Sequence, residues 1–362
     1  MRLLLFFLAF VPPPGAAVCE CGYSVQGPPD GRADGPWLFT DALESDFTRI
    51  ANISRDRDWV RQRFDVSAEA GRGKYGKAFD PANVVSRPRP RTDDEGEPPR
   101  WSGLELRVGG ALEGNAVPVA EVDSSRLDMQ WGSYRAAMKL PTVSGTCSAF
   151  FWYWNDTQEI DMEFLSREFD ASKKLYPVNL VIQSPKSMEA GYDASKTGTF
   201  KRVNLGFDPT DGFHEYRFDY LPGRVLFYAD SQMLTEMTGD VMPSGAGHVI
   251  LQHWSNGNPL WSGGPPTQDA LLTVSYVKAY FNSSGSAGLS AWSRQCSDTK
   301  TTVCAVQDTA ADAIGTGGHF FTDQRNKSSG GDDENKGPRR TDPSRGAARI
   351  ALLAMSLMLM MS

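Results

Sequence analysis

Three acidic residues, Glu159, Asp161 and Glu163, occupy every second position of the segment EIDMEF. Because side chains alternate between the two faces of a β-strand, this spacing predicts one strand with three carboxyl groups on one face. Neighbouring like charges repel one another, so a strand that serves only the fold would avoid such a row. The row is therefore either a solvated acidic face on an edge strand or a set of catalytic carboxylates.

The separation of the two glutamates bears on the kind of chemistry. Glu159 and Glu163 are four residues apart, which is about 13 Å between backbones in a straight strand. Two carboxyl groups that cleave a glycosidic bond with retention of configuration lie about 5–5.5 Å apart. Long side chains that lean inward on a curved strand narrow the gap. Asp161 lies between them and can push their pKa values apart, as a nucleophile and a proton donor require.

The elements that would position this row are short strands separated by turn residues. Strand patterns cover 104–108, 132–140, 147–154, 159–165, 177–184, 214–221, 224–230, 248–254 and 272–281. Turn signals lie at 144–146 and 221–224. With no strong helical period and no internal repeat, this spacing predicts an all-β protein, either an antiparallel sandwich of two sheets or a barrel. We expect Ile160, Met162 and Phe164 to face the core between the sheets.

Both ends of the chain resemble processing signals. Residues 1–17 combine Arg2, an apolar run and small residues, which is the pattern of a secretory signal peptide. Residues 350–362 are apolar, uncharged and too short to span a bilayer. A polar spacer precedes them, as in a glycosylphosphatidylinositol (GPI) attachment signal. The alternative is a short membrane-associating or frayed tail. We expect a secreted or cell-surface protein.

Between these ends we expect one large domain, residues 18–283, followed by a disordered linker rich in Ser, Gly and Asp, residues 284–349. Two segments rich in Pro, Gly and charge, 26–36 and 86–100, read as surface loops. The net charge is -7 and no Lys/Arg cluster suits nucleic acid. We expect a monomer.

Cysteines and sequons agree with the secretory route. The sequence has five cysteines, Cys19, Cys21, Cys147, Cys296 and Cys304, so one thiol stays free or pairs elsewhere. Cys296 with Cys304 would close a local loop, and Cys147 could join Cys19 or Cys21. The sequence leaves the pairing open. Asn-x-Ser/Thr sequons stand at Asn52, Asn155, Asn282 and Asn326.

Several segments in order resemble glycoside hydrolase family 16. EIDMEF resembles the E-x-D-x-E signature of that family, and YRAAMKLPTVSGTCSAFFWY resembles the strand before it. GFHEYRFDYLPGRVLFYADS is similar to a later family segment, with Tyr220 in place of a tryptophan, and LQHWSNGNPLWSGGPP to a strand beyond it. The resemblance runs from about Cys19 to Phe281 and is strongest for secreted fungal members.

The resemblance implies a β-jelly-roll of the concanavalin A-like type and a retaining mechanism. Glu159 would be the nucleophile, Glu163 the general acid/base, and Asp161 the residue that tunes both. The signature has no extra residue before its last glutamate, as in the branch that contains lichenases and transglycosylases. The expected activity is endo-hydrolysis of β-glucans of the β-1,3/1,4 type. The alternatives are a cell-wall transglycosylase acting on glucan or chitin, and a lectin-like binding module.

Sugar rings stack on aromatic faces, and their hydroxyls need fixed polar partners. Candidate substrate-binding residues are Trp254, Asn256, Asn179, Trp154, Trp261 and His214. For each aromatic residue the alternative is core packing, and for the polar residues it is a structural hydrogen bond. We expect no cofactor and no catalytic metal. Some members of the family bind a structural calcium, for which the sequence identifies no ligands.

Overall fold

The computed structural model describes residues 19–27, 35–90, 101–285, 292, 296 and 302–324. The predicted signal peptide (1–17) and apolar tail (350–362) lie outside these residues, as does the sequon at Asn326. Within the described part of the chain, no helix is long and apolar enough to cross a membrane.

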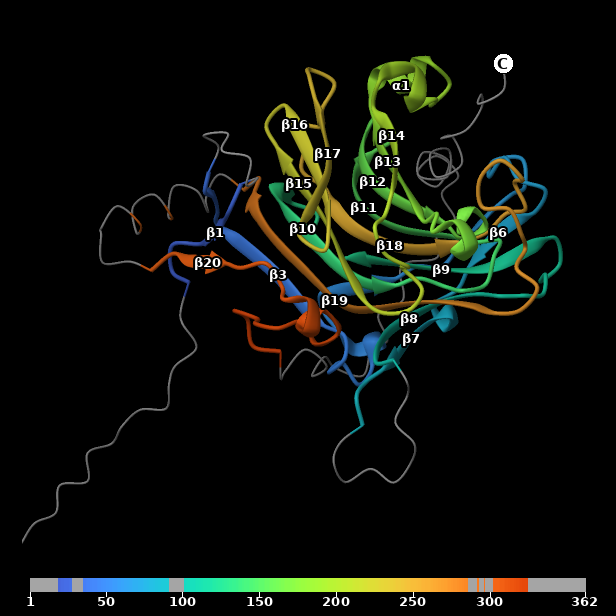
Figure 1. The fold of residues 1–362 in the computed structure, drawn as a ribbon, viewed down its shortest axis with the longest axis horizontal. Coiled ribbons are helices and arrows are strands. Elements are labelled where there is room, and N and C mark those ends of the chain that lie inside the picture. The colour runs from blue at the N-terminus through green and yellow to red at the C-terminus, as the bar shows by residue number, and fades with distance from the viewer. Residues whose placement is uncertain are drawn as a thin grey trace, which may run out of the picture.

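Two large sheets form the body of the molecule (Figure 1). The nine-stranded sheet has the order β14-β13-β12-β11-β18-β9-β6-β5, and β4 also pairs with β9. Its strands are β4 (Trp59–Arg61), β5 (Phe64–Val66), β6 (Gly76–Phe79), β9 (Ala116–Ser124), β11 (Cys147–Asn155), β12 (Gln158–Leu165), β13 (Pro177–Gln183), β14 (Phe200–Asn204) and β18 (His248–Trp254). Apart from the parallel pair β6–β9, its pairs are antiparallel.

The eight-stranded sheet packs against the first. Its order is β17-β16-β15-β10-β19-β8-β7, and β3 also pairs with β19. Its strands are β3 (Asp41–Asp46), β7 (Val84–Arg87), β8 (Gly103–Val108), β10 (Met129–Lys139), β15 (His214–Leu221), β16 (Arg224–Ala229), β17 (Gln232–Thr238) and β19 (Ala270–Ser283). All pairs in this sheet are antiparallel. The predicted all-β sandwich is confirmed.

The remaining elements are short. A small sheet joins β1 (Tyr23–Val25), β2 (Trp37–Phe39) and β20 (Cys304–Val306). The helical elements among the described residues are α1 (Pro185–Glu189), η1 (Ile53–Arg55), η2 (Pro81–Asn83), η3 (Ser166–Glu168), η4 (Ala171–Lys173), η5 (Ala194–Thr197) and η6 (Ala311–Thr316). Ser184 caps α1 in a reciprocal capping box with Ser187, which starts the helix directly after β13.

The main core lies between the two large sheets. Ile160, Met162 and Phe164 of β12 point into it and are at most 1% exposed. Burying each such side chain contributes about 1.5–3 kcal/mol relative to leaving it in water. Phe164 packs against Tyr216 of β15, with ring centroids 4.6 Å apart. The apolar half of β12 therefore fixes which face of the strand carries the three carboxyl groups.

The segment predicted as a disordered linker, 284–349, is partly ordered. Residues 302–324, here called the C-terminal strap, run over the face of the eight-stranded sheet that points away from the core. They contribute β20, which pairs in parallel with β1, and η6. Polar contacts to the sheet hold the strap together with a few buried apolar side chains, notably Val306 and Ile314. The polar composition of the segment gave no sign of this.

Two disulfides tie the chain ends of the domain together. Cys19 is bonded to Cys304, and Cys21 to Cys296. Cys147 is a buried free thiol. The two pairings considered from sequence, Cys296 with Cys304 and Cys147 with an N-terminal cysteine, are therefore wrong. Parallel pairing of β1 with β20 places the N-terminal cysteines beside the strap, while Cys147 lies on β11 inside the nine-stranded sheet.

The two bridges are nested, and this predicts a non-additive effect on stability. Either bridge alone closes a loop of 285 or 275 residues. Once one is closed, the second adds a loop of only about ten residues. Chain entropy then gives about 5–6 kcal/mol for the first bridge and about 2–3 kcal/mol for the second.

We therefore expect Cys19→Ala/Cys304→Ala and Cys21→Ala/Cys296→Ala each to lower the free energy of unfolding by much less than half of the loss in the fourfold variant. Denaturant unfolding of the three proteins measures this. Equal, additive losses from the two double variants would contradict the nested arrangement.

Candidate active site

The three carboxyl groups lie side by side on the face of β12 that points away from the core. Glu159, Asp161 and Glu163 are 3%, 3% and 4% exposed. The alternative of a solvated acidic edge is therefore wrong for this row, because β12 lies between β11 and β13 and its carboxyl groups are almost fully removed from water.

Register places defined partners on both sides of the row. On β11, Tyr153, Phe151 and Ala149 stand opposite Glu159, Asp161 and Glu163, respectively. On β13, Gln183 stands opposite Glu159 and Asn179 opposite Glu163. Tyr153, Phe151 and Ala149 belong to a small apolar cluster with Ile250. The carboxyl groups thus have an apolar strand on one side and amide side chains on the other.

Burial has a direct electrostatic consequence for Glu159 and Asp161. Removal from water raises the pKa of both carboxyl groups, because the charged form loses its hydration. A hydrogen bond between the two lowers the pKa of Glu159 and raises that of Asp161 further. The proton is therefore held on Asp161, which donates to Glu159. Within this pair the hydrogen bond favours the charged form of Glu159 over that of Asp161, while burial still raises the pKa of Glu159 to about 8.

Glu163 experiences a different environment. Burial raises its pKa to about 7, while the Cys147 thiol, the Trp261 indole and the Lys77 charge each act to lower it. The Cys147 Sγ lies 3.5 Å from Oε1 of Glu163. The Trp261 indole N–H is buried and has no acceptor at hydrogen-bond distance among the described residues. It lowers the pKa of Glu163 as a nearby donor. Glu163 can hold a proton in mildly acidic solution and lose it near neutrality.

Lys77 is the functional candidate that the sequence reasoning missed. It lies on β6, is 1% exposed, and its Nζ stands 4.5 Å from the centroid of the Trp254 ring. Burial lowers its pKa to about 8, against the opposing charges of Glu121 and Glu163. Its sequence neighbourhood, KYGKAF, holds two lysines and no carboxylate, so nothing local distinguished Lys77 as the buried one.

Three predicted binding residues lie close to the row. Trp254 is opposite Cys147 in the β11–β18 pair and is 1% exposed, packed in an apolar cluster that also contains Trp261. Trp261 is 5% exposed, and Arg167 donates to its carbonyl oxygen. Asn179 stands beside Glu163 and donates to Glu168 at 3.3 Å. The structure brings these three together with Glu163.

Asn256 makes hydrogen bonds within the protein, and Trp154 lies away from the carboxyl groups. The Asn256 amide donates to the carbonyl of Gly71 and its Oδ1 accepts from Ser262, so it joins two loops near the row. Trp154 is 48% exposed at the end of β11, against Gly245. Gly245 precedes β18, so Trp154 lies at the strand end beyond Glu159 rather than beside the carboxyl groups.

His214 lies outside the site. It belongs to β15 of the other sheet, stacks on Phe207 with centroids 3.7 Å apart, and its Nδ1 is 2.6 Å from Asp230. Its predicted substrate contact is therefore wrong. The sequence places His214 at the start of a strand, but it does not show which of the two sheets contains that strand.

A second buried acid–amide pair adjoins the row. Gln252 of β18 donates to Glu121 of β9, and both are at most 3% exposed. Gln252 stands opposite Ala149, which itself stands opposite Glu163. The polar strip thus continues from Asn179 through Glu163 to Gln252 and Glu121. Among the described residues, no group of three or more metal-ligating side chains could hold an ion.

Comparison with known proteins agrees with this geometry. Residues 119–278 match the family model for glycosyl hydrolases family 16. The beta-glucanase of Paenibacillus macerans is 32% identical over 130 residues, covering 34% of this chain and 48% of that protein. The beta-glucanase of Bacillus licheniformis is 29% identical over 159 residues, covering 41% and 58%. The chain thus spans about half the length of these curated relatives.

A solved structure shares the fold. The endo-beta-1,3-glucanase from Pyrococcus furiosus aligns with a TM-score of 0.50 at 17% identity, covering 68% of this chain and 95% of that one. The carboxylate row lies within residues 119–278, which match the model of that family. These relatives are not fungal, so the likeness to secreted fungal members stays a prediction.

The position of Lys77 predicts a measurable effect on Glu163. Lys77→Met keeps the length of the side chain and removes its charge, so the pKa of Glu163 should rise by about one unit. Lys77 itself is mostly charged while Glu163 titrates, since its own pKa is about 8. Carbon-13 NMR titration of the Glu163 carboxyl carbon measures the shift.

Lys74→Met is the matched control, because Lys74 is exposed three residues away. It should leave the titration of Glu163 unchanged. An unshifted Glu163 in Lys77→Met, with a folded spectrum, would show that the ammonium exerts no electrostatic effect on the row.

Proposed function

We propose that this chain is an extracellular, retaining, endo-acting β-glucan hydrolase. The observation that carries the proposal is the buried row of Glu159, Asp161 and Glu163 on one strand face, within the residues that match the family. Beta-glucanases among the curated relatives support β-glucan as the substrate class.

In the first step, Glu159 attacks the anomeric carbon as its carboxylate and forms a glycosyl-enzyme ester. The hydrogen bond from Asp161 lowers the pKa of Glu159 against the larger effect of burial, and so favours the carboxylate that attack requires. Glu163 gives its proton to the departing glycosidic oxygen, so the sugar leaves as a neutral alcohol. The raised pKa of Glu163 suits this role in mildly acidic solution.

In the second step, Glu163 removes a proton from water, which attacks the anomeric carbon and releases Glu159. If a sugar hydroxyl takes the place of water, the same residues carry out transglycosylation. The GPI-type tail predicted from sequence favours a cell-wall role of that kind. Sizing the products made from β-glucans separates the two, since products longer than the substrate mean transfer.

Replacing each glutamate in turn by glutamine tests which one is the nucleophile and which one is the proton donor. Glu159→Gln removes the nucleophile, so hydrolysis of every substrate should be lost. Glu163→Gln keeps the nucleophile, and polysaccharide cleavage should fall by about 10²–10⁴. The phenolate of an activated aryl β-glucoside departs without a proton from the enzyme. This variant should therefore release a burst of phenol and then turn over slowly. Rapid-mixing measurement of phenol release follows both.

Glu113→Gln, at an exposed position outside the row, is the control and should behave as the wild type. A burst from Glu159→Gln and none from Glu163→Gln would reverse the roles. Wild-type rates from both variants would place the active site elsewhere.

A further inference from the structure

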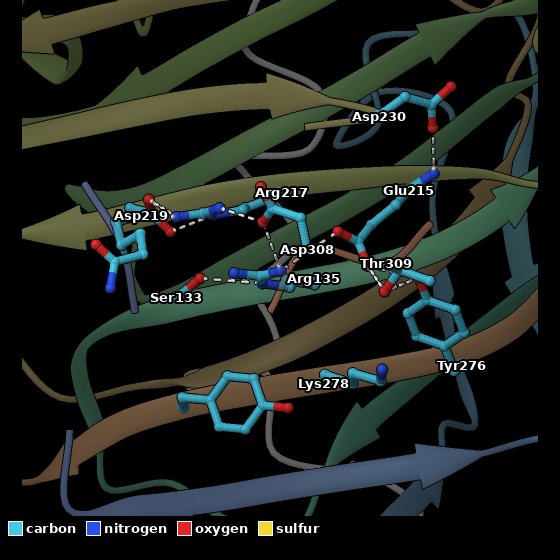
Figure 2. A network of polar contacts seen from close by, with 12 residues as sticks. Ser133, Arg135, Glu215, Arg217, Asp219, Asp230, Tyr276, Lys278, Asp308 and Thr309 are labelled. Atoms are coloured by element: carbon cyan, nitrogen blue, oxygen red, sulfur yellow. Dashed lines mark hydrogen bonds and ion pairs between the residues drawn. The ribbon is translucent and has the colours of Figure 1, made fainter. Parts of the chain in front are cut away.

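The face of the eight-stranded sheet that points away from the core carries an unusual row of cations. Lys278 of β19 stands opposite Arg135 of β10, and Arg135 stands opposite Arg217 of β15. They are 5%, 1% and 4% exposed. Like charges directly opposite one another on neighbouring strands are destabilising, so this row requires partners (Figure 2).

Carboxylates from the sheet and the strap supply those partners. Arg217 pairs with Asp219 at 2.6 Å, and Arg135 lies 3.6 Å from Glu215. Asp308 of the strap accepts from both guanidinium groups through the same oxygen, Oδ1, at 3.2 and 3.1 Å (Figure 2).

At the other end of the row, Glu44 stands opposite Lys278 and accepts from the Tyr280 hydroxyl at 2.7 Å. Four carboxylates, Glu44, Glu215, Asp219 and Asp308, thus face three cations. The surroundings carry no surplus of positive charge.

The strap leaves a cavity at the Lys278 end of this row. It has a volume of about 480 Å³ and lies between β19 and the strap. The lining residues are Lys278, Tyr280, Ala305, Val306, Gln307, Asp308, Thr309, Ala310, Ala313, Gly318, His319 and Phe321. The volume falls within the range of small-molecule sites.

The cavity wall offers both a donor and an acceptor. Lys278 donates to the carbonyl oxygens of Gly317 and His319 at 2.5 and 2.9 Å, and its ammonium also lies 4.8 and 4.6 Å from the ring centroids of Tyr276 and Phe320. A sugar hydroxyl would be a further oxygen acceptor for its third N–H group. The Asp308 side chain is 51% exposed, and within the described part of the chain its Oδ2 makes no hydrogen bond. Tyr280 and Phe321 add aromatic surface.

We propose that this cavity is a second ligand site, separate from the carboxylate row, for a neutral, hydroxyl-rich molecule of the sugar class. A hydroxyl group both accepts and donates, so adjacent sugar hydroxyls satisfy Lys278 and Asp308 together. An anion would add negative charge next to four carboxylates, and a cation would be repelled by the Lys278 ammonium. An apolar ligand would give the free oxygen of Asp308 no hydrogen-bond donor.

Titration of a nitrogen-15 labelled Glu159→Gln protein with cellotetraose, a neutral β-gluco-oligosaccharide, tests the site without cleavage of the probe. Backbone amides of residues 305–309 and 318–321 should shift and saturate. Sodium glucuronate, a charged sugar, should leave them unmoved at the same concentrations. Binding at the carboxylate row moves amides of β11 and β12 instead, so the two sites are read separately.

Two variants and one matched control decide the location. Ala313→Trp fills the cavity and should weaken the strap shifts at least about tenfold, whereas Ala311→Trp, on the same η6 turn but outside the lining, should not. Asp308→Ala removes the free acceptor and should weaken them as well.

Strap amides that stay unmoved by cellotetraose, or that respond equally in Ala313→Trp and Ala311→Trp, would overturn the proposal. The hydrolytic function is tested by the wild-type enzyme alone. A protein that binds cellotetraose under the strap and cleaves no β-glucan would overturn that function and leave this site standing.

Discussion

The removal of three carboxyl groups from water is the interaction on which the rest of the structure depends. A carboxylate transferred out of water costs several kcal/mol unless it is paired, hydrogen-bonded or protonated. The row on β12 uses all three means. Asp161 keeps its proton, Glu159 accepts a hydrogen bond from it, and Glu163 lies within the field of Lys77. The differences among these solutions give each acid its chemical role.

The sandwich makes such burial possible by giving each strand two distinct faces. On β12 the apolar face packs between the sheets and the acidic face points away from them. The same division holds on β10, where Tyr134 and Ala136 enter the core and Arg135 points to the other side. Each large sheet therefore buries charge on its outer face. The strap covers the cations of one sheet, and the Cys19–Cys304 disulfide holds its N-terminal part in place.

Strand alternation predicted the all-β fold, the core positions Ile160, Met162 and Phe164, and the shared face of the acids, because these depend on local period alone. Residues whose role depends on long-range pairing could not be found in this way. Lys77 meets Trp254 across strands that are far apart in sequence, and His214 lies on the sheet opposite the site. The strap was predicted as a linker because its order comes from a disulfide, polar contacts and a few scattered apolar side chains, none of which gives a periodic pattern.

The central claim is that the row holds one nucleophile and one proton donor in fixed positions. Trapping the covalent intermediate tests it most directly. A 2-deoxy-2-fluoro aryl β-gluco-oligosaccharide should label the enzyme once, and peptide mapping by mass spectrometry should place the sugar on Glu159. A label on Glu163 or Asp161, or a label that persists in Glu159→Gln, would contradict the account.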